Sequence, residues 1–322
     1  MAKTRASGAD TQLLAAFETS YGVIPDGSGG GVYSKMLFAS SGLSESRALG
    51  EDPLLGLGRA TLDPFYDASS TDGDIVVPID LRAFGVWLKA ALGAPNTVDN
   101  GDGTFDHTFT AGGDVPSLTL EIGHTQLSTP RYNKFAGVKV NTIAFDMART
   151  GAARATVSVV AQGEEPKTQT PADATPDEFA LVRFNQGKGS ISVGGTRLGN
   201  VTAGSLSFSN NLDLVETLRE DGKIDGADET TASVSGSITV RFSTDTTLED
   251  AINSETPLTM EYRYLIPDTS YAIIFTIPRV FLPKPKREIS GPGGISAKFD
   301  WQAAGADAAI MTVTLINDVA AY

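Results

Sequence analysis

Side chains that commonly carry catalysis or bind metals are scarce in this sequence, which has no cysteine and two histidines, His107 and His124. The absence of cysteine excludes a disulfide framework, a thiolate metal site and a cysteine nucleophile. Both histidines stand among strand-like residues, without partners at metal-ligand spacing, and the chain has no Gly-x-Ser-x-Gly elbow. We therefore expect both to be hydrogen-bonded histidines of a sheet, and we expect neither enzymatic activity nor a cofactor.

Two acidic loops match a calcium-binding loop only in part. In the loop 98–109, Val98 and Phe109 stand at positions one and twelve, which such a loop fills with carboxylates. In the loop that begins at Asp221, Lys223 occupies position three. Asn-Gly and Asp-Gly pairs supply the positive φ of tight turns, so both loops are interpreted as hairpin tips without a bound metal.

The 322 residues include 39 acidic and 25 basic side chains, a formal net charge of −14. This balance argues against ordinary nucleic-acid binding, which depends on lysine and arginine at the phosphates. A surface past which DNA must slide without sticking could use the same repulsion, and solubility alone also explains it. The chain has no run of about 18 apolar residues, so we expect no membrane insertion.

Most of the chain has the period-two alternation of antiparallel strands, punctuated by turn residues. Helices are expected at Thr11–Ser20, at Asp80–Leu92 with Asp80 as a cap, and at Leu248–Ile252. Strands are expected at Phe105–Thr110, Val115–Gly123, Val138–Met147, Ala153–Ala161, Ser233–Phe242, Pro257–Tyr264, Tyr271–Ile277, Ile295–Trp301 and Ala309–Ile316.

A segment rich in proline and charge divides the chain almost in half, and the same order of elements stands on each side of it. In the first half, the expected helix is preceded by a strand that contains Gly73, Ile75 and Val77. In the second half, a glycine-containing strand likewise precedes the helix at 248–252. Four strands follow each helix. We predict a tandem duplication. The expected organisation is an N-terminal arm with a short helix at 1–35, a β domain at 36–163, a linker at 164–178 and a second β domain at 179–322.

Two loops are candidates for contacts between subunits. The stretch that holds Leu54, Leu55, Leu57 and Arg59 is too broken by glycine and proline for a regular element, yet too apolar for a free loop. The densest basic run contains Lys284, Lys286 and Arg287. This run is either a solvated loop or a patch that meets an acidic neighbour when copies stack, and both interpretations remain open.

The order of short phrases along the first half resembles one known family. The phrase 17–25, Phe-Glu-Thr-Ser-Tyr-Gly-Val-Ile-Pro, is followed by Glu-Asp-Pro at 51–53, by the helix phrase Phe-Gly-Val-Trp-Leu-Lys-Ala-Ala-Leu-Gly at 84–93, and by strands at 105–109 and 116–121. This succession resembles the major tail tube proteins of long-tailed bacteriophages. The second half is similar only in its order of elements.

The resemblance implies a mainly β protein, an antiparallel sandwich or barrel with a flanking short helix. It implies that copies form stacked rings whose inner sheets join into a barrel, trimeric with pseudo-sixfold symmetry if the duplication is real and hexameric otherwise. It also implies a tape-measure protein inside the tube, completion or tip proteins at its ends, and viral DNA that passes through without specific binding. The location implied is the virion tail, assembled in the cytoplasm of the host bacterium.

The implied function is a conduit for genome ejection with a negatively charged lumen. Alternation alone makes Glu121, Asp146 and Asp300 candidates to face that lumen, while an ion-paired or solvent-facing role is equally compatible with each. One alternative is a β-rich module on a phage or cell surface that binds a receptor or glycan. Trp87 and Trp301 lie inside expected elements, which indicates core positions rather than the exposed aromatic loops of such a module. A β-rich hydrolase is a further alternative, but no carboxylate pair stands out for it.

Overall fold

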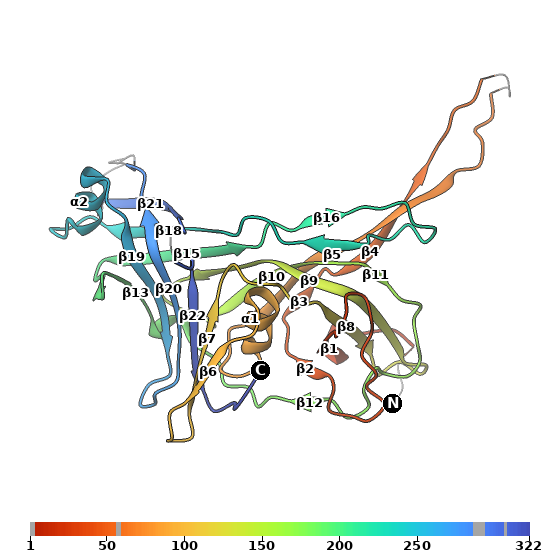
Figure 1. Cartoon of the computed structure of the whole chain (residues 1–322), viewed down its shortest axis with the longest axis horizontal. Helices are drawn as coiled ribbons and strands as arrows, with labels where there is room; N and C mark the ends of the chain where they lie inside the picture. Colours follow the sequence, from red (N-terminus) through yellow and green to blue (C-terminus); the bar gives the residue numbers. More distant parts are fainter. Residues whose placement is uncertain (1–3, 56–58, 286–293, 306–307) are drawn as a thin grey trace.

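The computed structural model describes residues 4–55, 59–285, 294–305 and 308–322 (Figure 1). In the first half the elements are β1 (Thr11–Phe17), β2 (Ser34–Met36), β3 (Ser40–Ser41), β4 (Ser44–Gly50), β5 (Phe65–Pro78), α1 (Phe84–Leu92), β6 (Asn96–Asp99), β7 (Phe105–Thr110), β8 (Leu118–His124), β9 (Arg131–Met147) and β10 (Arg154–Ala161). The second half, with the segment before it, contains β11 (Gly163–Glu164), β12 (Asp177–Glu178), β13 (Gly189–Val193), β14 (Thr196–Arg197), β15 (Val201–Ser209), β16 (Asp213–Val215), β17 (Gly226–Asp228), β18 (Ser233–Arg241), α2 (Thr247–Ser254), β19 (Leu258–Leu265), β20 (Ala272–Phe281), β21 (Ser296–Ala303) and β22 (Thr312–Asn317). The protein is therefore mainly β, as the sequence predicts.

A broad antiparallel layer runs in the order β4–β5–β10–β9–β15–β18–β21. Its strands alternate between buried and more exposed residues, so one face is apolar and the other polar. The pairing of β9 with β15 joins the two halves of the chain within this layer. The strands predicted at Val138–Met147 and Ala153–Ala161 are confirmed, although β9 begins earlier, at Arg131.

A second layer packs on the apolar face, with β13, β19, β20, β22, β7 and β6 paired in that order. Between the layers, the ring of Phe145 lies 4.6 Å from that of Phe275, centroid to centroid, and 6.3 Å from that of Tyr262. Trp301 Nε1 donates a hydrogen bond to the Tyr262 hydroxyl at 2.9 Å. The arrangement is sandwich-like and is not a closed barrel. Trp87 and Trp301 are both buried, as expected of core positions.

The helix expected at 11–20 is wrong, because residues 11–17 form strand β1. This strand pairs with β8 on one edge and with β2 on the other. Leu13, Leu14, Ala15 and Ala16 are all buried, so both faces of β1 are covered. A strand buried on both faces loses its alternation, and its apolar run then imitates a buried helix.

Helix α1 lies against β9 and β7, beneath the broad layer in Figure 1. Every residue of the helix except Lys89 is buried, in keeping with a sequence that is apolar on all sides. The helix begins at Phe84, not at Asp80 as predicted. The Asp80 carboxylate accepts hydrogen bonds from the backbone amides of Arg82, Ala83 and Phe84 at 2.9–3.1 Å, so it caps the turn that leads into the helix. Among the described residues no helix is long and apolar enough to cross a membrane.

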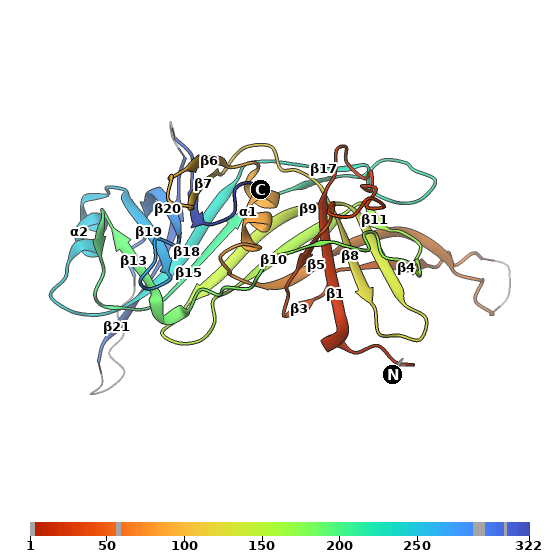
Figure 2. The ribbon, with the colours of Figure 1, turned by 90° about the horizontal axis from the view of Figure 1, so that it is seen from below.

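Strands β4 and β5 continue beyond the body as a projecting hairpin (Figures 1 and 2). We call this hairpin the arm and define it as residues 44–55 and 59–72. It is distinct from the N-terminal segment 1–35. Its base is held by the hairpin of β16 and β17, because the Gly222 carbonyl accepts a hydrogen bond from Ser69 N at 3.1 Å. Within the arm, Arg47 donates to the Asp67 carbonyl at 2.7 Å, and its guanidinium lies 5.6 Å from the centre of the Tyr66 ring. These contacts give the arm a defined direction.

Candidate functional site

The polar face of the broad layer contains two of the three acids predicted to face a lumen. Asp146 on β9 is directly opposite Ser205 on β15, Ser205 is opposite Ser237 on β18, and Ser237 is opposite Asp300 on β21. The Ser205 and Ser237 hydroxyls lie 2.9 Å apart. Asp146 and Asp300 are both exposed. One cross-strand row therefore presents two carboxylates separated by two hydroxyls.

Neighbouring cross-strand rows on this face also carry hydroxyl and carboxylate side chains. Asp74, Ser158, Thr142, Ser209 and Ser233 form one such row across five strands. The face is hollowed over β15, β18 and β21, where a groove of about 700 Å³ is lined by residues that include Ser207, Ser235 and Asp300. The result is a wide surface of short hydroxyl and acidic side chains.

Several cations lie on or beside this face, and one of them, Arg241 at the end of β18, is opposite Ser296 on β21. Lys298 forms an ion pair with Asp300 at 2.8 Å, with both side chains well exposed. Arg154, the first residue of β10, lines the same hollow as Asp146. These basic side chains offset part of the acidic charge of the face.

The prediction that Glu121 faces a lumen is wrong, because Glu121 is fully buried on β8. One carboxylate oxygen accepts from Ala172 N at 2.7 Å, and the other has no hydrogen-bond partner among the described residues. Burial raises the pKa of Glu121 to about 7, against the opposing hydrogen bond from Ala172 and the charge of Lys134. Alternation misplaced this residue because β8 lies inside its sheet, with the segment around Ala172 over its outer face.

The apolar contact candidates lie in the arm. Leu54 is 57% exposed and Leu55 100% exposed, and Arg59 is also exposed. Leu57 lies outside the described residues. The arm carries further exposed apolar side chains that sequence reasoning did not identify, namely Leu49, Leu62, Phe65 and Tyr66. An apolar surface on a projecting hairpin indicates a contact with another molecule.

Of the basic run, Lys284 is exposed, after the end of β20. Lys286 and Arg287 lie outside the described residues. Lys284 follows Pro283, which lines the same groove of the polar face as Asp300. The predicted role of these three residues in contacts between subunits stays a prediction.

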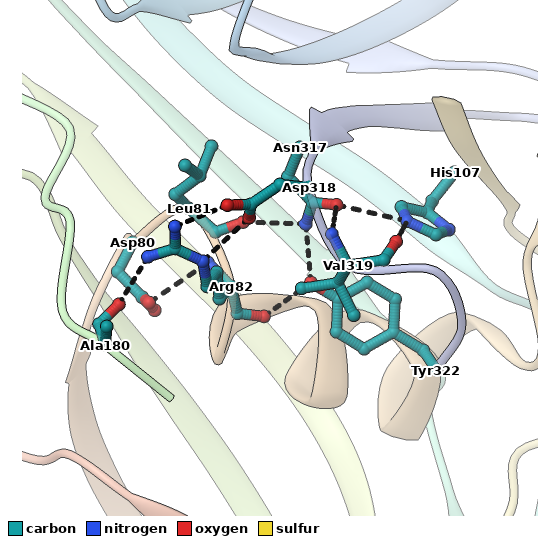
Figure 3. A network of polar contacts seen from close by, with 9 residues as sticks. All are labelled: Asp80, Leu81, Arg82, His107, Ala180, Asn317, Asp318, Val319 and Tyr322. Carbon is teal, nitrogen blue, oxygen red and sulfur yellow. Dashed lines mark hydrogen bonds and ion pairs between the residues drawn. The ribbon is translucent and has the colours of Figure 1, made fainter. Parts of the chain in front are cut away.

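His107 belongs to a polar network that joins β7, the start of α1 and the C-terminal segment (Figure 3). Its Nδ1 lies 2.8 Å from the Thr97 hydroxyl and its Nε2 2.8 Å from the Val319 carbonyl. The ring is buried and both nitrogens are engaged within the fold, so His107 is a hydrogen-bonded sheet histidine as expected. Among the described residues no cluster of three or more histidines or acids could hold a metal.

Apart from Asp80, sequence reasoning missed the other members of this network, which are far apart in the chain (Figure 3). Arg82 forms a two-point ion pair with Asp318, at 2.5 and 2.7 Å, and lowers the pKa of that carboxyl below its ordinary value. The Tyr322 hydroxyl donates to the Arg82 carbonyl and accepts from Asn317 Nδ2, both at 2.6 Å. The network ties the C-terminal segment to the first helix and has a structural role.

The two acidic loops are hairpin tips, as predicted. The first joins β6 to β7, with Gly101 and Gly103 at positive φ. The second lies between β16 and β17, where Arg219 forms ion pairs with Asp221 and Asp225 at 2.7 and 2.9 Å. Arg219 thereby offsets part of the negative charge of the second loop.

Comparison with known proteins agrees with these features. A family model described as phage tail tube protein matches residues 8–303. No match was found among curated proteins. The match spans both halves of the chain, including the arm, α1 and the whole polar face. The chain therefore belongs to the phage tail tube protein family and is a structural component of the virion tail.

Proposed function

We propose that copies of this chain assemble into stacked rings that form a conduit for the genome during ejection. The observation that carries this proposal is the row of Asp146, Ser205, Ser237 and Asp300, because it makes one acidic, hydroxyl-bearing face from both halves of the chain. A polymer that turned this face inward would present phosphate with the like charge of these carboxylates, and the cation Lys298 is engaged by Asp300. DNA would then pass without strong binding sites.

Asp146 and Asp300 are the proposed lumen-facing residues, and Glu121 is not. The row also contains the hydroxyls of Ser205 and Ser237, which hydrogen-bond to each other and add no positive charge. Sheets of neighbouring copies would continue the layer edge to edge, which covers strand edges that otherwise invite uncontrolled pairing. The narrower assignment to long-tailed phages is part of this proposal.

We further propose that the chain is a tandem repeat and that three chains form a pseudo-sixfold ring. In support, β5 precedes α1 and β18 precedes α2, and each helix is followed by antiparallel strands. The two halves contribute adjoining strands to one layer through β9 and β15, as neighbouring repeats in a ring would. Six chains per ring is the alternative.

The arm residues Leu54, Leu55, Leu57 and Arg59, together with Lys284, Lys286 and Arg287, are the proposed contacts between subunits. Family membership supports further partners, namely a tape-measure protein in the lumen and completion or tip proteins at the ends. Production in the host cytoplasm agrees with a chain that contains no cysteine.

Negative-stain electron microscopy of the concentrated protein, with mass photometry of the smallest closed species, tests the proposal. Rings or hollow tubes are the expected result, and three chains per ring would support the repeat. A protein that stays monomeric at every concentration would contradict it and favour the receptor-binding or glycan-binding alternative. Weaker stacking at high ionic strength would support the basic run as a contact, because salt screens exposed charges.

A further inference from the structure

A groove at the end of the molecule opposite the arm is complementary to the arm in charge and in apolar surface. It measures about 310 Å³ and opens between β13–β14 and β15, strands that belong to different layers. Its floor contains Met147, Ile191 and Leu198, which are core residues. These three side chains are 3–8% exposed, so the apolar edge of the core forms the floor of the groove.

The rim of this groove is basic. Arg149, from the turn between β9 and β10, and Arg197, from β14, both line it and are exposed. No ion pair is found for either arginine within the residues that the structure describes. In a chain with a net charge of −14, two unpaired cations beside an apolar floor suit an apolar segment with acidic flanks.

The arm presents such a segment. Glu51 and Asp52 are exposed and directly precede Pro53, Leu54 and Leu55, with no ion pair for either acid among the described residues. The leucines project from the arm rather than packing on the body. In the arm, two acidic residues stand next to two leucines. In the groove, two arginines stand next to an apolar floor, so the two surfaces are complementary.

The two surfaces cannot meet within one molecule, because strand β13, which borders the groove, and the arm lie at opposite ends of the longest axis (Figures 1 and 2). A contact between them therefore needs two copies, and it is heterologous, with a different surface on each partner. Contacts of this kind repeat from copy to copy and give closed rings or open stacks, not isolated dimers.

We propose that the groove lined by Arg149 and Arg197 receives the arm of a second copy of this chain, with Leu54 and Leu55 on the apolar floor and Glu51 and Asp52 against the two arginines. The inference rests on the proposed self-assembly and adds the acceptor surface for the arm. It makes assembly directional, since each copy carries one arm and one acceptor.

Charge reversal tests the pairing in the full-length protein. The variant R149E/R197E reverses the groove, and the variant E51R/D52R reverses the arm. Each alone is expected to raise the concentration needed for polymerisation by more than about tenfold, because like charges then meet across the contact. An equimolar mixture of the two is expected to assemble again, since each reversed surface finds its complement on the other variant.

The matched control for the groove variant is R131E/K167E, which makes the same change of net charge as R149E/R197E at exposed positions outside the groove. Light scattering and electron microscopy measure assembly, and circular dichroism measures folding. If wild-type protein polymerises and both reversed variants polymerise equally well, the groove is not the acceptor while the proposed function stands. If wild-type protein never polymerises, both the proposed function and this inference fail.

Cross-linking provides a measurement that does not depend on the folding of charge variants. The chain has no cysteine, so single replacements give unambiguous disulfides. Leu55→Cys protein mixed with Ala203→Cys protein, whose cysteine lines the groove, should form a disulfide-linked dimer in the polymer under mild oxidation. The mixture of Leu55→Cys with Lys167→Cys should not. Equal yields in the two mixtures would overturn the inference.

Discussion

Asp146 and Asp300 come from opposite halves of the chain and lie in one cross-strand row, separated by Ser205 and Ser237. Side chains alternate between the two faces of a strand, so this register places both carboxylates on the polar face of the broad layer. Neither half contains the row by itself. The pairing of β9 with β15 makes the acidic face a property of the whole chain.

Replacing these two acids by lysine should convert the polar face into a DNA-binding surface. Tubes of the variant D146K/D300K are expected to retain DNA that wild-type tubes do not, because each lysine can neutralise a phosphate and release counterions. Filter binding at several salt concentrations measures the effect. The logarithm of the binding constant should fall with the logarithm of salt concentration by about 0.9 for each phosphate neutralised.

The control for this prediction is E216K/E220K, which makes the same charge change at exposed acids on the hairpin of β16 and β17. These tubes should bind DNA no more tightly than wild type if only the lumen meets DNA. Equal retention by both variants would indicate that net charge, and not the position of the face, determines binding.

Glu121 should make the protein less stable as pH rises. Its pKa in the folded state is about 7, above the ordinary value of 4.5, so between these values the folded state binds more protons than the unfolded state. The free energy of unfolding therefore falls from about pH 4.5 to about pH 7, by an amount on the order of 3 kcal/mol. Glu121→Gln should remove this loss, and urea unfolding at pH 5 and pH 8 measures it.

Glu178→Gln is the matched control, because Glu178 is an exposed carboxylate paired with Lys35 at 2.7 Å. Its effect should stay below about 1 kcal/mol at both pH values. A Glu121→Gln variant with the same pH dependence as wild type would show that Glu121 remains ionised in the folded protein.

Tyr322→Phe should destabilise the fold by about 1–3 kcal/mol. The hydroxyl makes two hydrogen bonds of 2.6 Å, and its loss leaves the Arg82 carbonyl and Asn317 Nδ2 each with one partner fewer in a largely buried site. Tyr66→Phe, at an exposed position in the arm, should change stability by less than about 0.5 kcal/mol. Chemical denaturation measures the free energy of unfolding of both variants. Similar losses of stability in the two would show that the Tyr322 network does not stabilise the fold in particular.

Gly236→Ala should also destabilise the fold, although Gly236 lies in a strand. A Cβ atom there would stand 2.1 Å from the Ser205 carbonyl oxygen and 2.6 Å from Cζ2 of Trp301, which is buried. Relief of the overlap requires movement of the sheet or the indole, at about 1–3 kcal/mol. Ser235→Ala, at the exposed neighbouring residue, is the control and should change stability by less than about 0.5 kcal/mol in thermal unfolding.

Local patterns in the sequence were sufficient to predict an element wherever one of its faces meets the core and the other meets solvent. The strands at β10, β18 and β21 and the cap at Asp80 follow from alternation and hydrogen-bonding chemistry within a few residues. The patterns failed at β1 and at Glu121, where both faces of the strand are covered. In such places the neighbours that cover each face come from distant parts of the chain.

The sequence by itself determined that this is a mainly β protein with an acidic balance, no cysteine chemistry and an apolar segment outside the regular elements. Composition and short-range periodicity carry that information, because each depends on neighbouring residues alone. Only the tertiary structure decided which acids share a face, which carboxylate is buried, and that Arg149 and Arg197 border an apolar groove opposite the arm. Those relationships depend on strand register and on the packing of layers, which join residues that the sequence separates.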